Sequence, residues 1–572
     1  MDLSTLRHSC SHVMAQAVKS LWPEAKLAIG PSIEDGFYYD FDKPEPFAPE
    51  DLEKIERRMQ EIVKSNLPLK REEVSKKEAT ALFEKMNETY KLELLKEIPD
   101  EKVSLYKTGD QFVDLCRGPH VAATGEVKAF KLLSIAGAYW HGIETNPMLQ
   151  RIYGTAFENK KDLDNYLKFL EEAKKRDHRK LGKELELFDI FYDEAGAGLV
   201  FYHPKGAILR DILETYEKKE HVRRGYQMVI TPHLLKGELW KTSGHAGYYR
   251  ENMYMLTMDN QEYVVKPMNC PGHILIYKSK TRSYRDLPLR LFELGTVYRH
   301  EKSGVLHGLL RVRSFTQDDA HIFCMPEQVK SEIKDVIDFV FDTMKVFGFE
   351  NFKIEISTRP AKSIGTDEDW QKATAVLRES LDEKSLAYEI NEGDGAFYGP
   401  KIDIKLKDAI GRYWQCATIQ CDFALPQNFD LAYVACDGKN QRPVMLHRVI
   451  FGSLERFIGT LIEHYAGQFP LWLSPEQVLI IPLKPEVEAY AAQIEEALKK
   501  ESVRVSVDAS SDTLNKKIRN AELAKVPYCL VLGAREAEAR SVSVRSKAKG
   551  DLGVMKLEEF IQRVKEEINR KL

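Results

Sequence analysis

The pattern of hydrophobic and polar positions changes character along the chain, and each change predicts a new domain. Residues 1–157 mix short helical patterns with β-like runs such as "GFYYDFD" and contain a Gly/Pro loop, "CRGPHV". This mixture is typical of an α+β domain. In residues 158–187, Leu163, Tyr166, Leu167 and Leu170 recur at helical spacing among dense charges. We therefore expect a solvated linker helix after the first domain.

The longest stretch of uniform character is residues 188–470. It contains many β-like runs, among them "EYVVKPM", "KIDIKL" and "YWQCATIQCDF", with few helices between them. This pattern predicts a large antiparallel sheet with flanking helices. In residues 471–572 the β-like runs "VLIIPL", "VRVSVD" and "YCLVLG" alternate with helical patterns, which predicts a compact α/β domain. The fold class expected for the whole chain is α+β, with several domains.

Composition narrows the class of protein. The 572 residues are too many for one hydrophobic core, and no apolar run approaches the ~20 residues of a membrane span. The start "MDLSTLRHSC" has neither a secretory nor a transit-peptide pattern, so we expect a cytoplasmic protein without a membrane partner. The net charge is only -4, so a polyanionic partner must meet local basic patches. Eight scattered cysteines form no disulfide framework.

One cysteine raises a question of chemistry. Cys270 ends an apolar run in "KPMNCPGHILIY", where a buried, inert thiol is the common outcome, and its C-x-x-H spacing to His273 often arises by chance. Two distant histidines change the balance. His321 lies in a β-like stretch, and His447 lies at a strand-to-helix junction. One thiolate and two imidazoles on a tetrahedral zinc ion would leave one position open for a substrate.

Several motifs together resemble a known family. "YRHE" (298–301) with "LLRVRSF", and "GSLERF" (452–457), look like motifs 2 and 3 of class II aminoacyl-tRNA synthetases, and "VITPHLL" with Pro232 looks like motif 1. The runs "KPMNCPGH", "LHGLLRVRSFTQDDAHIFC", "GAFYGPKID" and "LHRVIFGSLERF" resemble the bacterial threonyl-tRNA synthetase family over essentially the whole chain. No P-loop of the G-x-x-x-x-G-K type is present.

This resemblance implies an activity and partners. It implies ATP-dependent activation of L-threonine to an adenylate, with Mg²⁺ accompanying the ATP, and transfer to the 3′ end of tRNA(Thr). The domains would be an editing domain (1–157), a linker helix (158–187), a class II catalytic domain (188–470) and an anticodon-binding domain (471–572). Motif 1 implies a homodimer. Many relatives carry a ubiquitin-like domain ahead of the editing domain, whereas this sequence starts at the editing histidines.

The resemblance also implies site residues. Positive charge must face the phosphate on which the reaction occurs, and Arg299 is the candidate. Glu301 would bind the adenine amino group, with Phe315 and Arg456 on the two faces of the base and Arg311 near the γ-phosphate. Cys270, His321 and His447 would hold one zinc ion, and His273 would have no role. His245 would serve the transfer step. The remaining pocket residues are Met268, Gln317, Asp319, Tyr398, Lys401, Gln415, Thr418, Gln420 and Ser453, with Lys401 also counted as catalytic.

A second set of histidines and a cysteine lies near the N-terminus. His8 and His12 are spaced i, i+4 on one helix face, and Cys116 and His120 have a C-x-x-x-H spacing. On spacing alone the four residues fit a zinc site as well as a hydrolytic one. The resemblance favours hydrolysis, because these positions match a domain that clears tRNA mischarged with serine. Tyr39, Lys91 and Asp114 would be their neighbours.

The C-terminal domain offers candidate RNA contacts. Lys516, Lys517 and Arg519 in "KKIRNAELAKVPY" are predicted to lie on a helix facing RNA phosphates, although a solvated basic face would show the same pattern. The resemblance adds Glu536 and Arg545 as contacts to anticodon bases. Thr513 stands where a basic residue is expected.

Two other functions remain open on the sequence alone. A class II synthetase for serine or proline would share the three motifs, and it differs in whether Cys270, His321 and His447 hold a metal. A non-catalytic RNA-binding regulator could keep the fold, although retention of Arg299 and Arg456 argues against it. An ATP–pyrophosphate exchange assay separates these possibilities.

Overall fold

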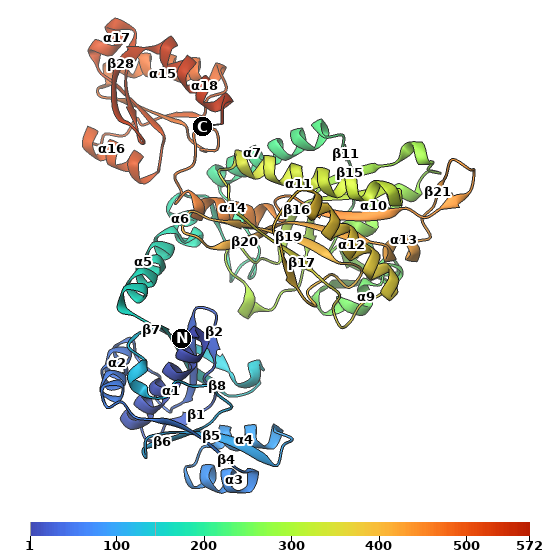
Figure 1. Cartoon of the computed structure of the whole chain (residues 1–572). Helices are drawn as coiled ribbons and strands as arrows, with labels where there is room; N and C mark the ends of the chain where they lie inside the picture. The colour runs from blue at the N-terminus through green and yellow to red at the C-terminus, as the bar shows by residue number, and fades with distance from the viewer. Residues whose placement is uncertain (1, 144, 572) are drawn as a thin grey trace. The chain divides into compact units, whose positions relative to one another are not determined.

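The computed structural model describes residues 2–143 and 145–571 and divides into two compact units, Met1–Glu171 and Glu172–Leu572 (Figure 1). Within the described residues, every helix is too short or too polar to cross a bilayer.

The first unit packs two helices against a small antiparallel sheet. Its sheet order is β1-β3-β8-β7, with β2 paired to β3, and the core is formed by apolar residues of α1, α2 and these strands. A second sheet has the order β4-β5-β6 and is covered by α3 and α4. The bounds are α1 Leu3–Leu21, β1 Lys26–Leu27, β2 Ser32–Ile33, β3 Gly36–Asp42, α2 Pro49–Lys64, β4 Leu69–Ser75, α3 Lys76–Lys85, α4 Thr89–Glu97, β5 Lys102–Thr108, β6 Phe112–Leu115, β7 Ala129–Tyr139 and β8 Met148–Phe157.

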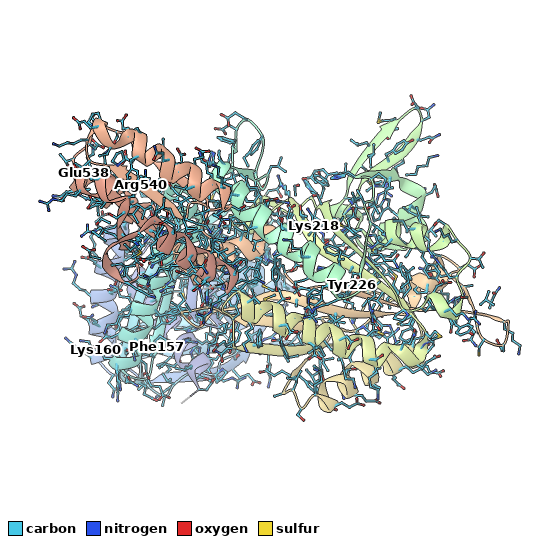
Figure 2. All side chains as sticks on the ribbon, turned by 90° about the horizontal axis from the view of Figure 1, so that it is seen from above. Phe157, Lys160, Lys218, Tyr226, Glu538 and Arg540 are labelled. Carbon is cyan, nitrogen blue, oxygen red and sulfur yellow. The ribbon has the colours of Figure 1, made fainter. Side chains whose placement is uncertain are left out.

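The predicted linker helix is divided into two helices of different character. The first, α5 (Lys160–Arg176), follows Phe157 and is mostly exposed (Figure 2). The second, α6 (His178–Glu184), starts at the N-cap Asp177 and buries His178, Leu181 and Gly182. In the sequence of α6, "HRKLGKE", charged residues stand on both sides of Leu181 and Gly182. These charges predict solvation, so the burial cannot be recognised from the sequence.

The second unit is built on an eight-stranded sheet, as the class II resemblance predicts. Its order is β11-β15-β16-β23-β20-β19-β17-β18, antiparallel except for the two edge pairs. Helices α11 and α12 lie across one face (Figure 1), where they share a large apolar core with α7 and α14. The sheet strands are β11 Gln227–Met228, β15 Leu289–Tyr298, β16 Ser314–Cys324, β17 Phe352–Ser357, β18 Glu389–Asn391, β19 Lys401–Lys407, β20 Tyr413–Asp422 and β23 Val444–Val449.

Helices and short hairpins complete this part of the second unit. Tyr226, just after α7 (Figure 2), receives a hydrogen bond from Arg448 on β23, at 3.2 Å, and so ties the helix end to the sheet. The helices are α7 Pro204–Arg223, α8 Gly237–Thr242, α9 His245–Tyr248, α10 Cys270–Lys278, α11 Val329–Val346, α12 Asp367–Glu383, α13 Ala424–Asn428 and α14 Leu454–His464. The short strands are β9 Phe188–Asp189, β10 Phe201–Tyr202, β12 Leu234–Lys236, β13 Tyr254–Met258, β14 Gln261–Val265, β21 Tyr433–Val434 and β22 Asn440–Gln441.

The C-terminal part has the predicted α/β character. Its mixed sheet has the order β25-β24-β26-β27-β28, with the first three strands parallel. Its own apolar core lies between this sheet and helices α15 and α18. The bounds are β24 Val478–Pro482, α15 Glu488–Lys500, β25 Val505–Val507, α16 Leu514–Leu523, β26 Tyr528–Leu532, α17 Ala534–Ala539, β27 Ser541–Ser546, β28 Gly550–Lys556 and α18 Leu557–Asn569.

Candidate functional site

A cavity of about 780 Å³ lies on the side of the large sheet opposite the core helices. Strand β16 supplies Phe315, Gln317, Asp319 and His321 to it, because alternate residues of a strand point to the same face. Most of the predicted site residues line this cavity, namely Met268, Cys270, Arg299, Glu301, Arg311, Phe315, Gln317, Asp319, His321, Tyr398, Lys401, Gln415, Thr418, Gln420, His447, Ser453 and Arg456.

One end of the cavity is rich in arginine. The Arg299 guanidinium lies 5.0 Å from the centre of the Phe315 ring, and its Nε donates to the Pro267 carbonyl. Arg456 donates through Nε to the Leu310 carbonyl at 3.1 Å. Burial lowers the pKa of Arg456, and the neighbouring arginines add to this effect. A site that gathers cationic groups around an aromatic ring is suited to a polyphosphate joined to a base.

Asp403 organises the polar wall of the cavity, although no motif in the sequence singles it out. It lies on β19, almost fully buried, and it accepts hydrogen bonds from Gln415 Nε2 at 2.7 Å and Thr418 Oγ1 at 2.8 Å. Lys401 Nζ lies 2.9 Å from the same carboxylate. Burial disfavours the charge of Lys401, but Asp403 and Asp394 outweigh it and raise the lysine pKa. Three predicted side chains thus share one buried anchor.

Cys270, His321 and His447 lie close together at the buried end of the cavity. Their ligand atoms all fall within 4.8 Å of one another, and His321 Nε2 is 3.0 Å from His447 Nδ1. The pairing of β16 with β23 places the two histidines directly opposite each other, while Cys270 is the first residue of α10. These described residues can hold a metal ion.

The two histidines are held by carboxylates that sequence analysis missed. His447 Nε2 donates to Asp422 at 2.8 Å, which leaves Nδ1 as the free ligand nitrogen. His321 Nδ1 lies 2.8 Å from His273 Nδ1, and His273 Nε2 lies 3.1 Å from Glu293. Each ring therefore presents one nitrogen to the group and has a partner for the other, as metal-binding histidines do. His273 is thus not without a role, because it connects His321 to Glu293.

Glu293 is the carboxylate at the end of the hydrogen-bonded chain that runs from His321 through His273. It also accepts from the Thr231 amide and hydroxyl, each at 2.8 Å, and pairs with buried Lys266. Burial opposes its charge, but the hydrogen bonds from His273 and Thr231 and the charge of Lys266 outweigh it and lower the Glu293 pKa to about 2. No short-range sequence pattern joins Glu293 to His273, so only the fold reveals the pair.

His245 differs from the other predicted residues in its surroundings. It is fully buried at the start of α9, and its Nδ1 lies 2.8 Å from Ser243 Oγ. Its Nε2 lies 3.9 Å from Cys270 Sγ, so it adjoins the metal-binding group without lining the cavity. Burial lowers the pKa of His245 to about 3.

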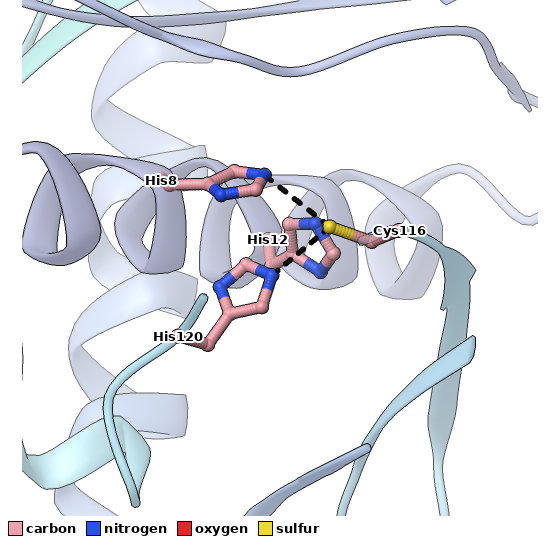
Figure 3. A group of neighbouring side chains, drawn as sticks. All are labelled: His8, His12, Cys116 and His120. Atoms are coloured by element: carbon pink, nitrogen blue, oxygen red, sulfur yellow. Dashed lines mark hydrogen bonds between the residues drawn. The ribbon is translucent and has the colours of Figure 1, made fainter. Parts of the chain in front are cut away.

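The N-terminal unit brings its four predicted residues together (Figure 3). His8 and His12 extend from one face of α1 toward the loop after β6, where Cys116 and His120 lie. Cys116 Sγ is 3.2 Å from His120 Nε2 and 3.4 Å from His8 Nε2. Ser9, which sequence analysis passed over in "RHSCSH", orients His120 by a 3.1 Å contact between its hydroxyl and Nδ1.

Tyr39, Lys91 and Asp114 lie beneath this group in full burial. Tyr39 donates to Asp114 at 2.6 Å, Lys91 donates to the Tyr39 hydroxyl at 2.9 Å, and Lys91 and Asp114 form an ion pair. Asp114 lies 3.7 Å from His12 Nε2 and so connects the two sets. All seven predicted residues converge on one place.

Burial keeps this group uncharged. It lowers the pKa of His8 and His12, and it lowers that of His120 to about 2 with help from the other two histidines. Burial raises the pKa of the Cys116 thiol to about 11. A protonated thiol is a poor nucleophile, which favours a positioning role for Cys116.

The predicted RNA-contact residues do not all face solvent. Lys516 and Arg519 are exposed on α16, but Lys517 is only 5% exposed and donates to the Asp508 carbonyl at 2.8 Å. The expectation that Lys517 faces phosphates is therefore corrected. It lies one turn from buried Ala521, on the helix face that packs against the sheet. Arg545 is exposed beside a small cavity, whereas Glu536 is half-buried and caps α17 by accepting from Gly533 N.

Three family models match separate parts of the chain. Residues 254–465 match the model of the tRNA synthetase class II core domain (G, H, P, S and T), and residues 477–567 match an anticodon-binding domain. Residues 103–153 match the threonyl and alanyl tRNA synthetase second additional domain.

Whole-chain relatives decide the family. Threonine–tRNA ligase of Citrifermentans bemidjiense is 59% identical over 99% of this chain and 88% of its own length. The chain belongs to the threonine–tRNA ligase family. The ligase of Acetivibrio thermocellus is 57% identical over the same shares of both chains. A structure of the RNA-binding domain of threonyl-tRNA synthetase from Cryptosporidium parvum covers 68% of this chain and 98% of its own, with 42% identity and a TM-score of 0.66.

Family membership makes the chain an ATP-dependent aminoacyl-tRNA ligase for threonine, with the additional domain that this family shares with alanyl enzymes. It confirms the class II core, the additional domain and the anticodon-binding domain expected from sequence. It also excludes two alternatives, namely a class II synthetase for serine or proline and a non-catalytic RNA-binding regulator.

The neutral histidines of the N-terminal unit predict a pH dependence. Their folded pKa values lie below 6.5, so below pH 6.5 the unfolded chain takes up protons that the folded chain does not, and stability falls as pH falls. For fully buried His12 this amounts to about 1.4 kcal/mol per pH unit. We expect hydrogen exchange of α1 peptides in the whole chain to lose protection from pH 6.5 to 5.5, after correction for the intrinsic rate.

His12→Gln provides the control, because it removes one titrating group while keeping a polar side chain. The loss of protection with falling pH should be smaller in this variant than in the parent. Equal losses in the two proteins would show that His12 takes up its proton in the folded chain.

Proposed function

We propose that the chain activates L-threonine at the cavity over the large sheet. In this assignment the ATP base stacks on Phe315, with Glu301 at its amino group and Arg456 on its other face. Arg299 faces the α-phosphate, where negative charge develops as the carboxylate attacks. Arg311 and a Mg²⁺ ion carried with ATP neutralise the far phosphates. The gathering of arginines around Phe315 supports this assignment.

Recognition of threonine is proposed to depend on one zinc ion held by Cys270, His321 and His447. The observation that carries this proposal concerns the ring nitrogens of His447 and His321. Each ring directs one nitrogen toward the group, and its other nitrogen is linked by hydrogen bonds to a carboxylate, directly in His447 and through His273 in His321. Three protein ligands leave an open coordination position, through which zinc would bind the amine and hydroxyl of threonine. Valine lacks the hydroxyl, and a site built for that group rejects it by ~10⁴-fold or more.

Around this group, the chain's own residues orient the amino acid and exclude water. Asp319 accepts from Asn269 Nδ2 at 3.0 Å and offers a carboxylate to the substrate amine. Tyr398 donates to Gln420 at 2.5 Å and stacks on His447. Asp403 fixes Lys401, Gln415 and Thr418. Met268 and Gln317 line the remaining wall, and Ser453 caps α14 beneath Arg456. His245 is assigned to the later transfer to the tRNA hydroxyl.

Removing the thiolate tests the metal assignment. We expect Cys270→Ala to lose both bound zinc and threonine-dependent ATP–pyrophosphate exchange, whereas Cys436→Ala, at an exposed cysteine, keeps both. Asp422→Asn should keep the three ligands but bind zinc about 10–100-fold more weakly in competition with a chelator. Metal content and exchange with threonine, serine and valine are measured on the same samples. Full zinc occupancy in Cys270→Ala would refute the ligand set.

The N-terminal unit is proposed to hydrolyse tRNA mischarged with serine. Serine keeps the hydroxyl and lacks one methyl group, a difference worth only about 1–3 kcal/mol in binding. A second, hydrolytic site is therefore needed. Neutral His8, His12 and His120 can accept hydrogen bonds from water, and the protonated Cys116 thiol can help to position it. The buried Lys91–Asp114 pair holds His12 in place from below.

Loss of these histidines should affect clearance and not activation. We expect His12→Ala and His120→Ala to slow clearance of Ser-tRNA(Thr) by at least ~100-fold, the scale of losing a group that positions the reacting atoms. Threonine activation should stay at the parental rate, and His141→Ala, at an exposed histidine of the same unit, should change neither. Parental clearance by the double variant, or a zinc ion bound by all four N-terminal side chains, would contradict the hydrolytic role.

A homodimer is proposed through β11 and the motif 1 segment that follows it. Ile230 is 85% exposed and Met228 is 55% exposed there, next to Pro232. Large apolar side chains with this exposure are typical of a surface that a second subunit covers. We expect light scattering to give a dimer for the parent and a monomer for Ile230→Lys. Val554→Lys, at a 62% exposed position of the C-terminal sheet, should remain dimeric. A fully active parental monomer would contradict the proposal.

The remaining assignments concern tRNA and compartment. Residues 1–157 are proposed as the editing domain, 158–187 as the linker, 188–470 as the catalytic domain and 471–572 as the anticodon-binding domain. Exposed Lys516, Arg519 and Arg545 are the favoured RNA contacts, with Glu536 beside them. We place the activity in the cytoplasm, where tRNA charging serves protein synthesis. Substitution of Arg545 should weaken tRNA binding and leave ATP–pyrophosphate exchange intact.

A further inference from the structure

His178, the first residue of α6, is fully buried and makes three hydrogen bonds that join distant parts of the second unit. Its Nδ1 lies 2.6 Å from Glu463 on α14, and its backbone N–H donates to the same carboxylate oxygen at 3.1 Å. Its Nε2 accepts from the Leu309 amide at 3.0 Å. The donor and acceptor roles fix a neutral ring with the proton on Nδ1. Because both ring nitrogens are engaged, His178, Asp177 and Glu463 do not form a metal site, although their atoms lie close enough.

Leu309 belongs to the loop between β15 and β16, which contains the motif 2 arginine Arg311. The loop closes as a tight turn, with Leu310 N donating to the His307 carbonyl at 2.9 Å and His307 N donating to the Arg311 carbonyl at 3.0 Å. Gly308 has a φ of +48°, and a Cβ there would lie 2.2 Å from His178 Nε2. The turn therefore rests directly on the imidazole edge, and only glycine permits this approach.

The turn also sets the position of Arg456. Arg456 Nε donates to the Leu310 carbonyl at 3.1 Å, and Gly459 of the same helix lets Leu309 and Leu310 pack closely on α14. Glu463, which orients His178, lies two helical turns after Arg456 on α14. His178 thus holds the motif 2 turn and the motif 3 helix in one fixed arrangement.

We infer that His178 is a positioning residue for ATP binding: it holds the Gly308–Arg311 turn against α14 and thereby places Arg311 and Arg456 for the nucleotide. The inference rests on the proposed ATP contacts of these two arginines. His178 is not among the residues that line the cavity, and it lies in the segment whose charges predict a solvated linker.

Two amide substitutions separate positioning from packing. In His178→Gln, the side-chain oxygen reaches the place of Nε2 and can accept from the Leu309 amide. In His178→Asn, the shorter side chain reaches only the place of Nδ1 and leaves that amide without its partner. We expect the KM for ATP in threonine-dependent exchange to rise about three- to tenfold in His178→Asn, the effect of one lost hydrogen bond. His178→Gln should stay within about twofold of the parent, and the KM for threonine should be unchanged in both.

Leu181→Ala supplies the control for a purely structural effect. Leu181 is buried on the same helix and packs toward Gly467. This variant should lower the melting temperature and leave the KM for ATP at the parental value. A rise in that KM in Leu181→Ala, equal effects of Asn and Gln at position 178, or parallel changes in the KM for threonine would each overturn the inference.

Arg311→Ala distinguishes failure of this inference from failure of the ATP assignment. If Arg311→Ala raises the KM for ATP and His178→Asn does not, the ATP assignment stands and the positioning role of His178 is wrong. If Arg311→Ala leaves the KM for ATP unchanged, the proposed contacts are wrong and the role of His178 falls with them.

Discussion

The candidate active site depends on the antiparallel pairing of β16 with β15 and β23 in one register. That register sets His321 opposite His447, and it aligns Phe315, Gln317, Asp319 and His321 along one face of β16. A slip of one residue would turn all four away from the cavity. The parts of the cavity proposed for the nucleotide and the amino acid, together with His321 and His447, are therefore placed by one set of backbone hydrogen bonds.

The opposite face of β16 keeps the register in place. Asp318, fully buried, accepts from the backbone amides of Ile450, Phe451 and Gly452, at 2.5 to 3.0 Å. These amides form the turn that leads from β23 into α14. Burial removes this carboxylate from water and so raises the pKa of Asp318 to about 6. Asp318 thus binds the backbone at the start of motif 3, whereas its neighbour Asp319 faces the cavity.

Much of this arrangement could be predicted from sequence, and the three acidic residues that were not predicted share one cause. Strand periodicity predicts the antiparallel sheet, and the motif residues around Arg299 and Cys270 are recognisable as short runs. Asp403, Glu293 and Asp422 are not, because each acts on a partner at least twelve residues away along the chain, and a single aspartate or glutamate in a strand carries no local signal. The prediction that Lys517 faces RNA was wrong for a different reason. A run of basic residues does not indicate which of their side chains turns inward.

The surroundings of the two histidine–cysteine groups, and not their residue types, favour different proposed roles, which are metal binding in the cavity and hydrolysis in the N-terminal unit. In the cavity, His447 and His321 are each linked to a carboxylate, which makes the free nitrogen a better ligand. In the N-terminal group, His120 is oriented by the Ser9 hydroxyl, and Asp114 is already paired with Lys91 and hydrogen-bonded to Tyr39. There the histidines lack a carboxylate-linked partner of this kind, and this is the difference that favours metal binding in the cavity. The N-terminal group is therefore the candidate for orienting water, so the same residue types support different proposals at the two sites.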